Sequence, residues 1–163
     1  MHWADCDDEI KMDDFLGQIT KVDDLRRFAL EVACSFEGEI QEERLHMAIS
    51  VVEDYLNDMA SLERLKEIHS ETQQYLEQIE IHELSQPEED KDMKWEKAAL
   101  VSWAAVPPDS CIGRSPLEVA RQAALHSALY AYRIRGAKEL KNQCEILKMI
   151  GLPHYHPPEA SEQ

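Results

Sequence analysis

Apolar residues recur at helical spacing along most of this chain, and no segment alternates between apolar and polar residues as a β-strand would. In the clearest stripe, from Val22 to Phe36, apolar side chains fall at positions i, i+3, i+7, i+10, i+11 and i+14. Helix-forming residues abound, while only five glycines and seven prolines interrupt them. The sequence therefore predicts an all-α fold, a compact bundle or stack of about six antiparallel helices.

Capping signals mark the ends of several predicted helices. Thr20-Lys-Val-Asp23 has the form of a capping box, Ser61 has the position of an N-cap, and Ser115-Pro-Leu-Glu118 is a clear helix start. Gly38 is expected to stop the first long helix, and Gly136 allows a break or kink near the end of the chain. The stripes and these signals place helices at 12–19, 22–36, 42–59, 61–81, 93–106, 115–134 and 137–150.

A chain of 163 residues is long enough for one domain with its own core. We expect a single helical domain at 1–153, with an internal linker at 83–92, where the sequence is polar, charged and contains proline, and a flexible tail at 154–163. No apolar run reaches the ~18 residues of a membrane span. The N-terminus is acidic and lacks the pattern of a signal peptide, which favours a cytoplasmic location.

The four cysteines, Cys6, Cys34, Cys111 and Cys144, are widely spaced and form no C-x-x-C pair. Cys34 and Cys144 lie on apolar helical stretches, which is typical of small buried side chains. The spacing therefore argues against a zinc site, and no metal or other cofactor is predicted.

Charge is distributed unevenly along the chain. The net charge is -16 overall, but residues 111–150 alone carry +4. Packing this basic end against the acidic body would balance charge internally, and this is our interpretation of the cluster Arg133, Arg135, Lys138 and Lys141. A nucleic-acid interface is the alternative, but the surrounding negative field would repel phosphate, so no direct nucleic-acid partner is expected.

Three segments together carry a resemblance to a known group of proteins. They are "DDLRRFALEVACSF", "ERLHMAISVVEDYLNDMASLERLKEI" and, after an alanine-rich stretch, "AKELKNQCEILKMIGLP". The chain resembles a family of uncharacterised bacterial all-helical proteins over residues 20–82 and 116–153. That family typically has a cysteine pair after the first helix stripe, whereas only Cys34 is present here. The resemblance implies the fold and no activity.

Two carboxylate pairs are candidates for a metal site. Glu39 and Glu42 are spaced i, i+3, and Asp54 and Asp58 are spaced i, i+4, so each pair would share a face if it lay on a helix. Two such pairs facing each other would hold Mg²⁺ through oxygen ligands, as in helical nucleotide phosphohydrolases. The alternative is a solvated acidic surface, which a chain with 33 acidic residues produces readily.

Signals for other catalytic chemistry are weak. His46, His69 and His126 lie on different predicted helices, where an interior hydrogen bond is the ordinary role of a histidine. His154 and His156 form a pair in the tail, which alone would bind a metal weakly. No nucleophile elbow, P-loop or dinucleotide fingerprint occurs, so we do not expect an enzyme.

The excess of acid is the feature that most favours a function. A net charge of -16 exceeds the magnitude of about 2–8 that solubility requires of a small domain. Concentrated negative charge speeds and orients docking onto a basic protein, as in toxin immunity proteins that block basic nucleases and in phosphate mimics that inhibit DNA-binding machinery. The alternative is that the charge only keeps the protein soluble. A structural adaptor with Trp95 and Trp103 as anchors is a further alternative. The predicted partner-binding residues are Glu37, Glu39, Glu42, Glu43, Asp54, Asp58, Glu88, Glu89 and Asp90.

Overall fold

All regular structure in the described residues, 2–83 and 93–152 of the computed structural model, is helical. This confirms the predicted all-α class, and these residues form seven α-helices where about six were expected. The elements are η1 (Trp3–Asp5), α1 (Glu9–Leu16), α2 (Val22–Cys34), η2 (Glu37–Glu39), α3 (Glu43–Leu56), α4 (Leu62–Glu83), α5 (Lys94–Ala104), α6 (Pro116–Arg135) and α7 (Ala137–Met149).

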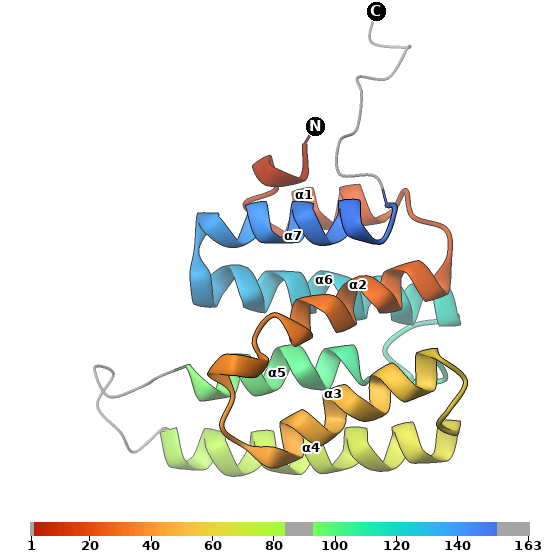
Figure 1. Cartoon of the computed structure of the whole chain (residues 1–163), viewed down its shortest axis with the longest axis vertical. Helices are drawn as coiled ribbons and strands as arrows, with labels where there is room; N and C mark the ends of the chain where they lie inside the picture. Colours follow the sequence, from red (N-terminus) through yellow and green to blue (C-terminus); the bar gives the residue numbers. More distant parts are fainter. Residues whose placement is uncertain (1, 84–92, 153–163) are drawn as a thin grey trace, which may run out of the picture.

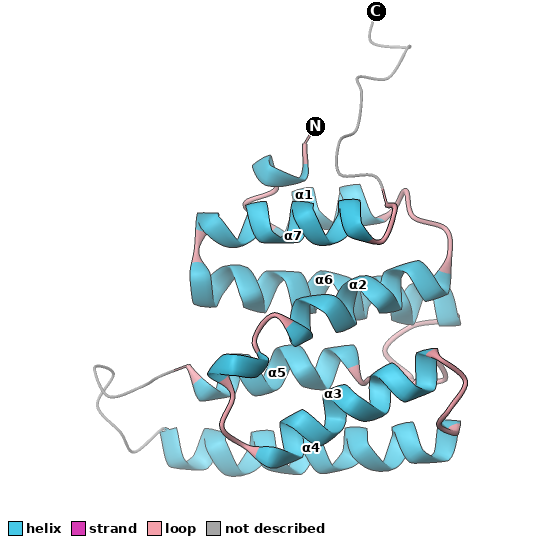
Figure 2. Ribbon diagram, viewed as in Figure 1, coloured by secondary structure: helices cyan, strands magenta, loops and turns pink. Residues whose placement is uncertain are grey.

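The helices lie across the long axis of the molecule and stack along it, with α4 at one end and α1 and α7 at the other (Figure 1). Helices that follow each other directly, such as α5, α6 and α7, reverse direction at each connection (Figure 1). No strand interrupts the stack in the parts of the chain drawn in Figure 2 as helix or loop. None of the helices described is long and apolar enough to cross a membrane.

Helix α6 lies at the centre of the stack and contacts α1, α2, α5 and α7. Its buried positions are mainly alanines, and such small side chains let neighbouring helices approach closely. The Ser127 hydroxyl also donates to the Leu100 carbonyl oxygen of α5 at 3.1 Å. The alanine-rich sequence of α6 therefore gives it the central position.

The predicted helix starts are partly confirmed. Ser115 accepts from the Glu118 N–H at 3.2 Å, and Ser61 accepts from the Arg64 N–H at 3.1 Å, so both serines are N-caps. The capping box at Thr20 is wrong, because Lys21 occupies the N-cap position and its side chain makes no capping bond.

The predicted helix ends are also only partly confirmed. Gly38 does not stop α2, which ends at Cys34, since Gly38 lies inside the separate helix η2. At Gly136, φ is +72° and ψ is -157°, a conformation that separates α6 from α7.

The N-terminal segment closes the α1–α7 end of the core. Trp3 is fully buried, and its ring meets Phe15 and Phe28 edge-on with centroid distances of 5.1 and 5.6 Å. Its indole N–H donates to the Gln143 side-chain oxygen of α7 at 2.9 Å. The acidic sequence around Trp3 gave no indication that η1 would pack into the core.

One buried arginine ties the end of α5 to α2. The Arg26 side chain is only 2% exposed and donates to the carbonyl oxygens of Val106 at 2.6 Å and Ala104 at 3.5 Å. These oxygens lie at the C-terminal end of α5, where carbonyl groups lack helical partners and the helix dipole favours a cation. The Arg26 Nε and Nη1 atoms have no hydrogen-bond partner among the described residues.

Two arginines of α6 make the same kind of contact with other helices. Arg121 donates to the carbonyl oxygens of Gly17 at 3.0 Å and Ile19 at 3.3 Å, just after α1. Arg135 donates to the carbonyl oxygen of Ser35, which follows α2, at 2.7 Å. Three helix C-termini are therefore held by arginines from elsewhere in the chain.

The carboxylate of Glu139 depends on Arg135 for its charge partner. It is fully buried and lies 3.0 Å from an Arg135 nitrogen. We predict that Arg135→Ala lowers the free energy of unfolding by about 2–3 kcal/mol, because a buried acid loses its cation. The Asn142 and Gln143 side chains still donate to Glu139, which limits the loss.

Urea denaturation measures this effect, and Lys138→Ala provides the control. Lys138 is exposed on the next helix and its loss changes the net charge equally, so a change within about 0.5 kcal/mol is expected there. Equal stability of the two variants would contradict the role given to Arg135.

Candidate functional site

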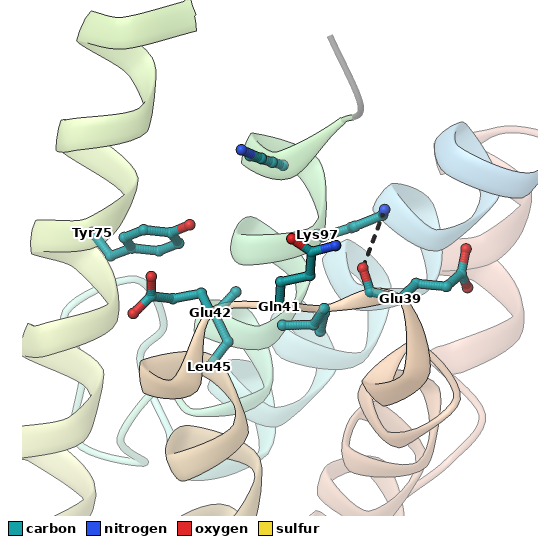
Figure 3. Close-up of a pocket in the computed structure, with 8 residues that line it drawn as sticks. Glu39, Gln41, Glu42, Leu45, Tyr75 and Lys97 are labelled. Carbon is teal, nitrogen blue, oxygen red and sulfur yellow. Dashed lines mark hydrogen bonds between the residues drawn. The ribbon is translucent and has the colours of Figure 1, made fainter.

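Two of the predicted acidic residues, Glu39 and Glu42, line a pocket of about 330 Å³, which we call the Glu39 pocket (Figure 3). It lies between the segment that joins η2 to α3 and the helices α4 and α5. Its lining residues are Glu39, Ile40, Gln41, Glu42, Leu45, Tyr75, Lys94 and Lys97.

Glu39 is fixed by contacts with two distant helices. Its carboxylate pairs with Arg135 at the end of α6, and this hydrogen bond holds the pKa of Glu39 below its usual range. Lys97 of α5 lies 3.5 Å from the Glu39 carbonyl oxygen (Figure 3). Figure 3 shows the carboxylate turned away from Tyr75, on the side of the pocket that faces α6 and α7.

Glu42 is fixed locally. It is the N-cap of α3 and accepts from the Arg44 backbone N–H at 3.4 Å and from the Arg44 guanidinium at 2.8 Å. The guanidinium bond lowers the pKa of Glu42, and the same guanidinium lies 4.6 Å above the Tyr75 ring centroid. The Glu42 carboxylate therefore stays ionised next to the aromatic wall of the pocket.

Glu37 and Glu43, like Glu39, are exposed acids of this region, but they are not fixed by an arginine. Glu37 begins η2 and Glu43 begins α3, and neither forms an ion pair with another described residue. Together with Glu39 and Glu42 they form a set of four carboxylates, which we call the acidic rim. The structure thus brings together four of the nine predicted partner-binding residues.

Asp54 and Asp58 do not join the acidic rim. Asp54 lies in the last turn of α3, and Asp58 follows the helix in a left-handed conformation with φ of +59°. Twelve residues of helix separate Glu42 from Asp54, a length of about 18 Å at 1.5 Å per residue. Glu88, Glu89 and Asp90 lie outside the described residues.

The two helical carboxylate pairs considered as an alternative Mg²⁺ site are therefore not formed in the described residues. Glu39 and Glu42 do not share a helix face, since η2 ends at Glu39 and α3 begins only after Glu42. Asp54 and Asp58 do not share one either, because α3 has ended before Asp58. Within residues 2–83 and 93–152, no group of three His, Cys, Asp or Glu side chains is placed to hold a metal ion.

Lys94 and Lys97 give the Glu39 pocket a second, basic wall that sequence analysis missed. The two lysines are spaced i, i+3 at the start of α5, so they share a face, but sequence analysis assigned no role to that face. Nothing local in the sequence indicates that α5 packs opposite the acidic rim. The pocket therefore carries both signs of charge.

The basic segment of the chain divides into internal and external parts. Arg135 is internal, as its contacts with Ser35, Glu39 and Glu139 show. Arg133 is exposed, with its guanidinium 5.0 Å from the Tyr130 ring centroid. Lys138 and Lys141 are exposed on α7, so internal charge balance applies to Arg135 but not to the whole cluster.

His46, His69 and His126, the three histidines considered in the sequence analysis, have different surroundings. His46 bonds the Ile40 carbonyl oxygen at 2.7 Å, and His126 bonds the Gln122 side chain at 3.2 Å, as an interior histidine is expected to do. His69 makes no side-chain hydrogen bond to any described residue, which sequence analysis did not anticipate. His154 and His156 lie outside the described residues.

The chain matches no known protein-family model, no curated protein and no solved structure. The resemblance to bacterial all-helical proteins therefore stays a prediction.

The unbonded imidazole of His69 makes stability depend on pH. Burial, and then the nearby Arg26 cation, lower the pKa of His69 from 6.5 to about 4. Between these values the unfolded chain binds a proton that the folded chain does not, so the free energy of unfolding falls as pH falls through this range. We predict that His69→Phe makes this fall smaller by about 1–3 kcal/mol.

Urea denaturation of both proteins at a series of pH values from 7 to 4 measures the difference. The carboxylates are common to both proteins, so their contributions cancel. Parallel stability curves for the two proteins would show that the folded state does not exclude a proton from His69.

Proposed function

We propose that this protein is a non-enzymatic binding module of the inhibitor or immunity type, which docks its acidic surface onto a basic protein partner. The observation that carries the proposal is the acidic rim, four carboxylates from η2 and the start of α3, two of which, Glu39 and Glu42, line an open pocket. A nuclease or a toxin with a basic active surface has the chemistry to match it.

The inner carboxylates of the rim are held ready for a partner's cation. Arg135 and Arg44 each bond one carboxylate oxygen, Oε2 of Glu39 and Oε1 of Glu42. The other oxygen of each has no hydrogen-bond partner among the described residues and can accept from an arginine or lysine of the partner. Because the carboxylates are already fixed, less conformational entropy is lost on docking.

The outer carboxylates and the net charge act at longer range. Glu37 and Glu43 are exposed, and the whole chain carries -16, a field that attracts and orients a basic partner before contact. Lys94 and Lys97 on the opposite wall would repel a cation there and so favour one orientation of the partner. The same negative field disfavours nucleic acid and anionic membrane surfaces as partners.

The proposal requires no cofactor and places the protein in the cytoplasm. The four cysteines are all unpaired, which supports a reducing compartment. Nothing in the geometry favours the Mg²⁺-dependent phosphohydrolase. The structural-adaptor alternative has little support, because Trp95 and Trp103 are half-buried and do not project as contacts for a large partner.

A pair of charge reversals tests the position of the docking surface. The variant Glu37→Lys with Glu43→Lys should weaken binding of an arginine-rich decapeptide by about tenfold, because two attractive contacts become repulsive. Fluorescence anisotropy of the labelled peptide at low salt measures the dissociation constant. Binding to the unchanged protein should weaken steeply as salt rises, since screening acts beyond about 10 Å at 0.1 M.

The matched control is Asp13→Lys with Asp14→Lys. These two acids are exposed on α1, at the other end of the helix stack, and their reversal changes the net charge equally. We expect a loss of less than about threefold, from the long-range field alone. Equal losses for the two double variants, or affinity indifferent to salt, would contradict docking at the acidic rim.

A further inference from the structure

A second pocket, of about 210 Å³, lies between α4, α5, α6 and the loop that follows α5. Unlike the Glu39 pocket, it is lined by no lysine, arginine, aspartate or glutamate among residues 2–83 and 93–152. Its lining includes the side chains of Trp95, Trp103, Tyr130, His69 and Ser102. We call it the tryptophan pocket.

Aromatic rings form much of its wall, and their positions are fixed by other rings. Trp95 meets Tyr130 edge-on with a centroid distance of 5.6 Å. Trp103 stacks on His126 with a centroid distance of 4.2 Å and an interplanar angle of 20°. Rings held in this way present a rigid aromatic surface, which suits a flat ligand because little side-chain entropy is lost on binding.

Two polar side chains at this pocket lack the partners that similar groups have elsewhere in the molecule. Ser127 donates to a backbone carbonyl and His46 bonds one, whereas neither Ser102 nor the His69 imidazole has a side-chain hydrogen bond to a described residue. Ser102 is only 6% exposed. Unlike the sealed nitrogens of Arg26, the polar atoms of Ser102 and His69 stay open to solvent at the pocket, so both are available to bond a ligand there.

Charge and size narrow the class of that ligand. In the described part of the chain, no lysine, arginine, aspartate or glutamate lines the pocket. The low pKa of His69, about 4, keeps its imidazole neutral at neutral pH. A charged ligand would therefore lose its hydration without gaining a counter-charge. An apolar cavity of about 150 Å³ already accepts benzene, so this pocket has room for one substituted ring or a fused pair.

We propose that the tryptophan pocket binds an uncharged heteroaromatic compound of one or two rings, packed against Trp95, Trp103 and Tyr130 and hydrogen-bonded to His69 and Ser102. This site is separate from the acidic rim. On α5, Lys94 and Lys97 face the Glu39 pocket while Trp95 and Ser102 face the tryptophan pocket, so the same helix serves both sites.

Isothermal titration calorimetry with indole and toluene as probes tests the proposal. Both rings fit the pocket, but only indole has an N–H that His69 can accept. We expect indole to bind with a dissociation constant below about 1 mM, an affinity that a ligand of nine non-hydrogen atoms can readily reach. In His69→Phe, which keeps a ring and removes both nitrogens, indole should bind about fivefold more weakly, while toluene binds as well as before or better.

A blocking variant keeps the test valid if His69→Phe fails to fold. Gln73 is exposed at the edge of the pocket on α4, and Gln73→Trp places a large ring there without altering the core. It should reduce binding of both probes at least tenfold, whereas the acidic-rim variant Glu37→Lys with Glu43→Lys should bind them unchanged. Unchanged probe binding by this variant would show that the tryptophan pocket and the acidic rim are independent sites. The pocket proposal can then fail while the docking proposal stands, and the reverse.

Three results would overturn the proposal. One is the absence of saturable indole binding to the unchanged protein at millimolar concentration. Another is equal binding of indole to Gln73→Trp and to the unchanged protein. The third is an equal loss of indole and toluene binding in His69→Phe, which would show that the imidazole nitrogens do not contact the ligand.

Discussion

Arginine side chains that reach the C-terminal carbonyl oxygens of other helices hold this helix stack together. Arg26 joins α2 to the end of α5, Arg121 joins α6 to the chain after α1, and Arg135 joins α6 to the end of α2. Apolar packing brings the helices together and favours certain crossing angles. A guanidinium bonded to specific carbonyl oxygens adds a directional contact, and it satisfies groups that a helix end would otherwise leave unpaired.

The candidate site depends on the same contacts. Arg135 bonds the carbonyl oxygen of Ser35 and the carboxylate of Glu39, so one side chain fixes the end of α2 and places an acid of the rim. Farther along the stack, α5 separates a pocket of mixed charge from a pocket whose described lining residues carry no charge at neutral pH. Two sites of opposite chemistry on one helix are possible because successive residues of a helix point in different directions.

Local signals in the sequence were enough to predict the helices. The contacts between helices that are distant in the sequence were not predicted, because they depend on long-range packing. The apolar stripe of α2 and the Ser115 cap of α6 depend on neighbours within one or two turns, so both could be read directly. Arg26 stands beside Leu25 in that stripe, where a charged residue is ordinarily taken for the solvent side, yet it is buried because α5 ends against it. Residue types at the acidic rim were predicted, but the lysines opposite them come from a helix more than fifty residues later. Such pairings follow from the stack, and no spacing within one segment indicates them.

The substitution Arg26→Met tests the central role of these arginines most directly. Methionine fills a similar volume and keeps the apolar contacts, but it leaves the carbonyl oxygens of Ala104 and Val106 without their donor. If the guanidinium holds the end of α5, urea denaturation at neutral pH should show the free energy of unfolding reduced by about 1–3 kcal/mol. Replacing a buried charge by an apolar side chain is often neutral or stabilising. Unchanged or increased stability of Arg26→Met would therefore contradict the account. It would show that the desolvation of the guanidinium is at least as large as the stabilisation from its hydrogen bonds to the carbonyl oxygens.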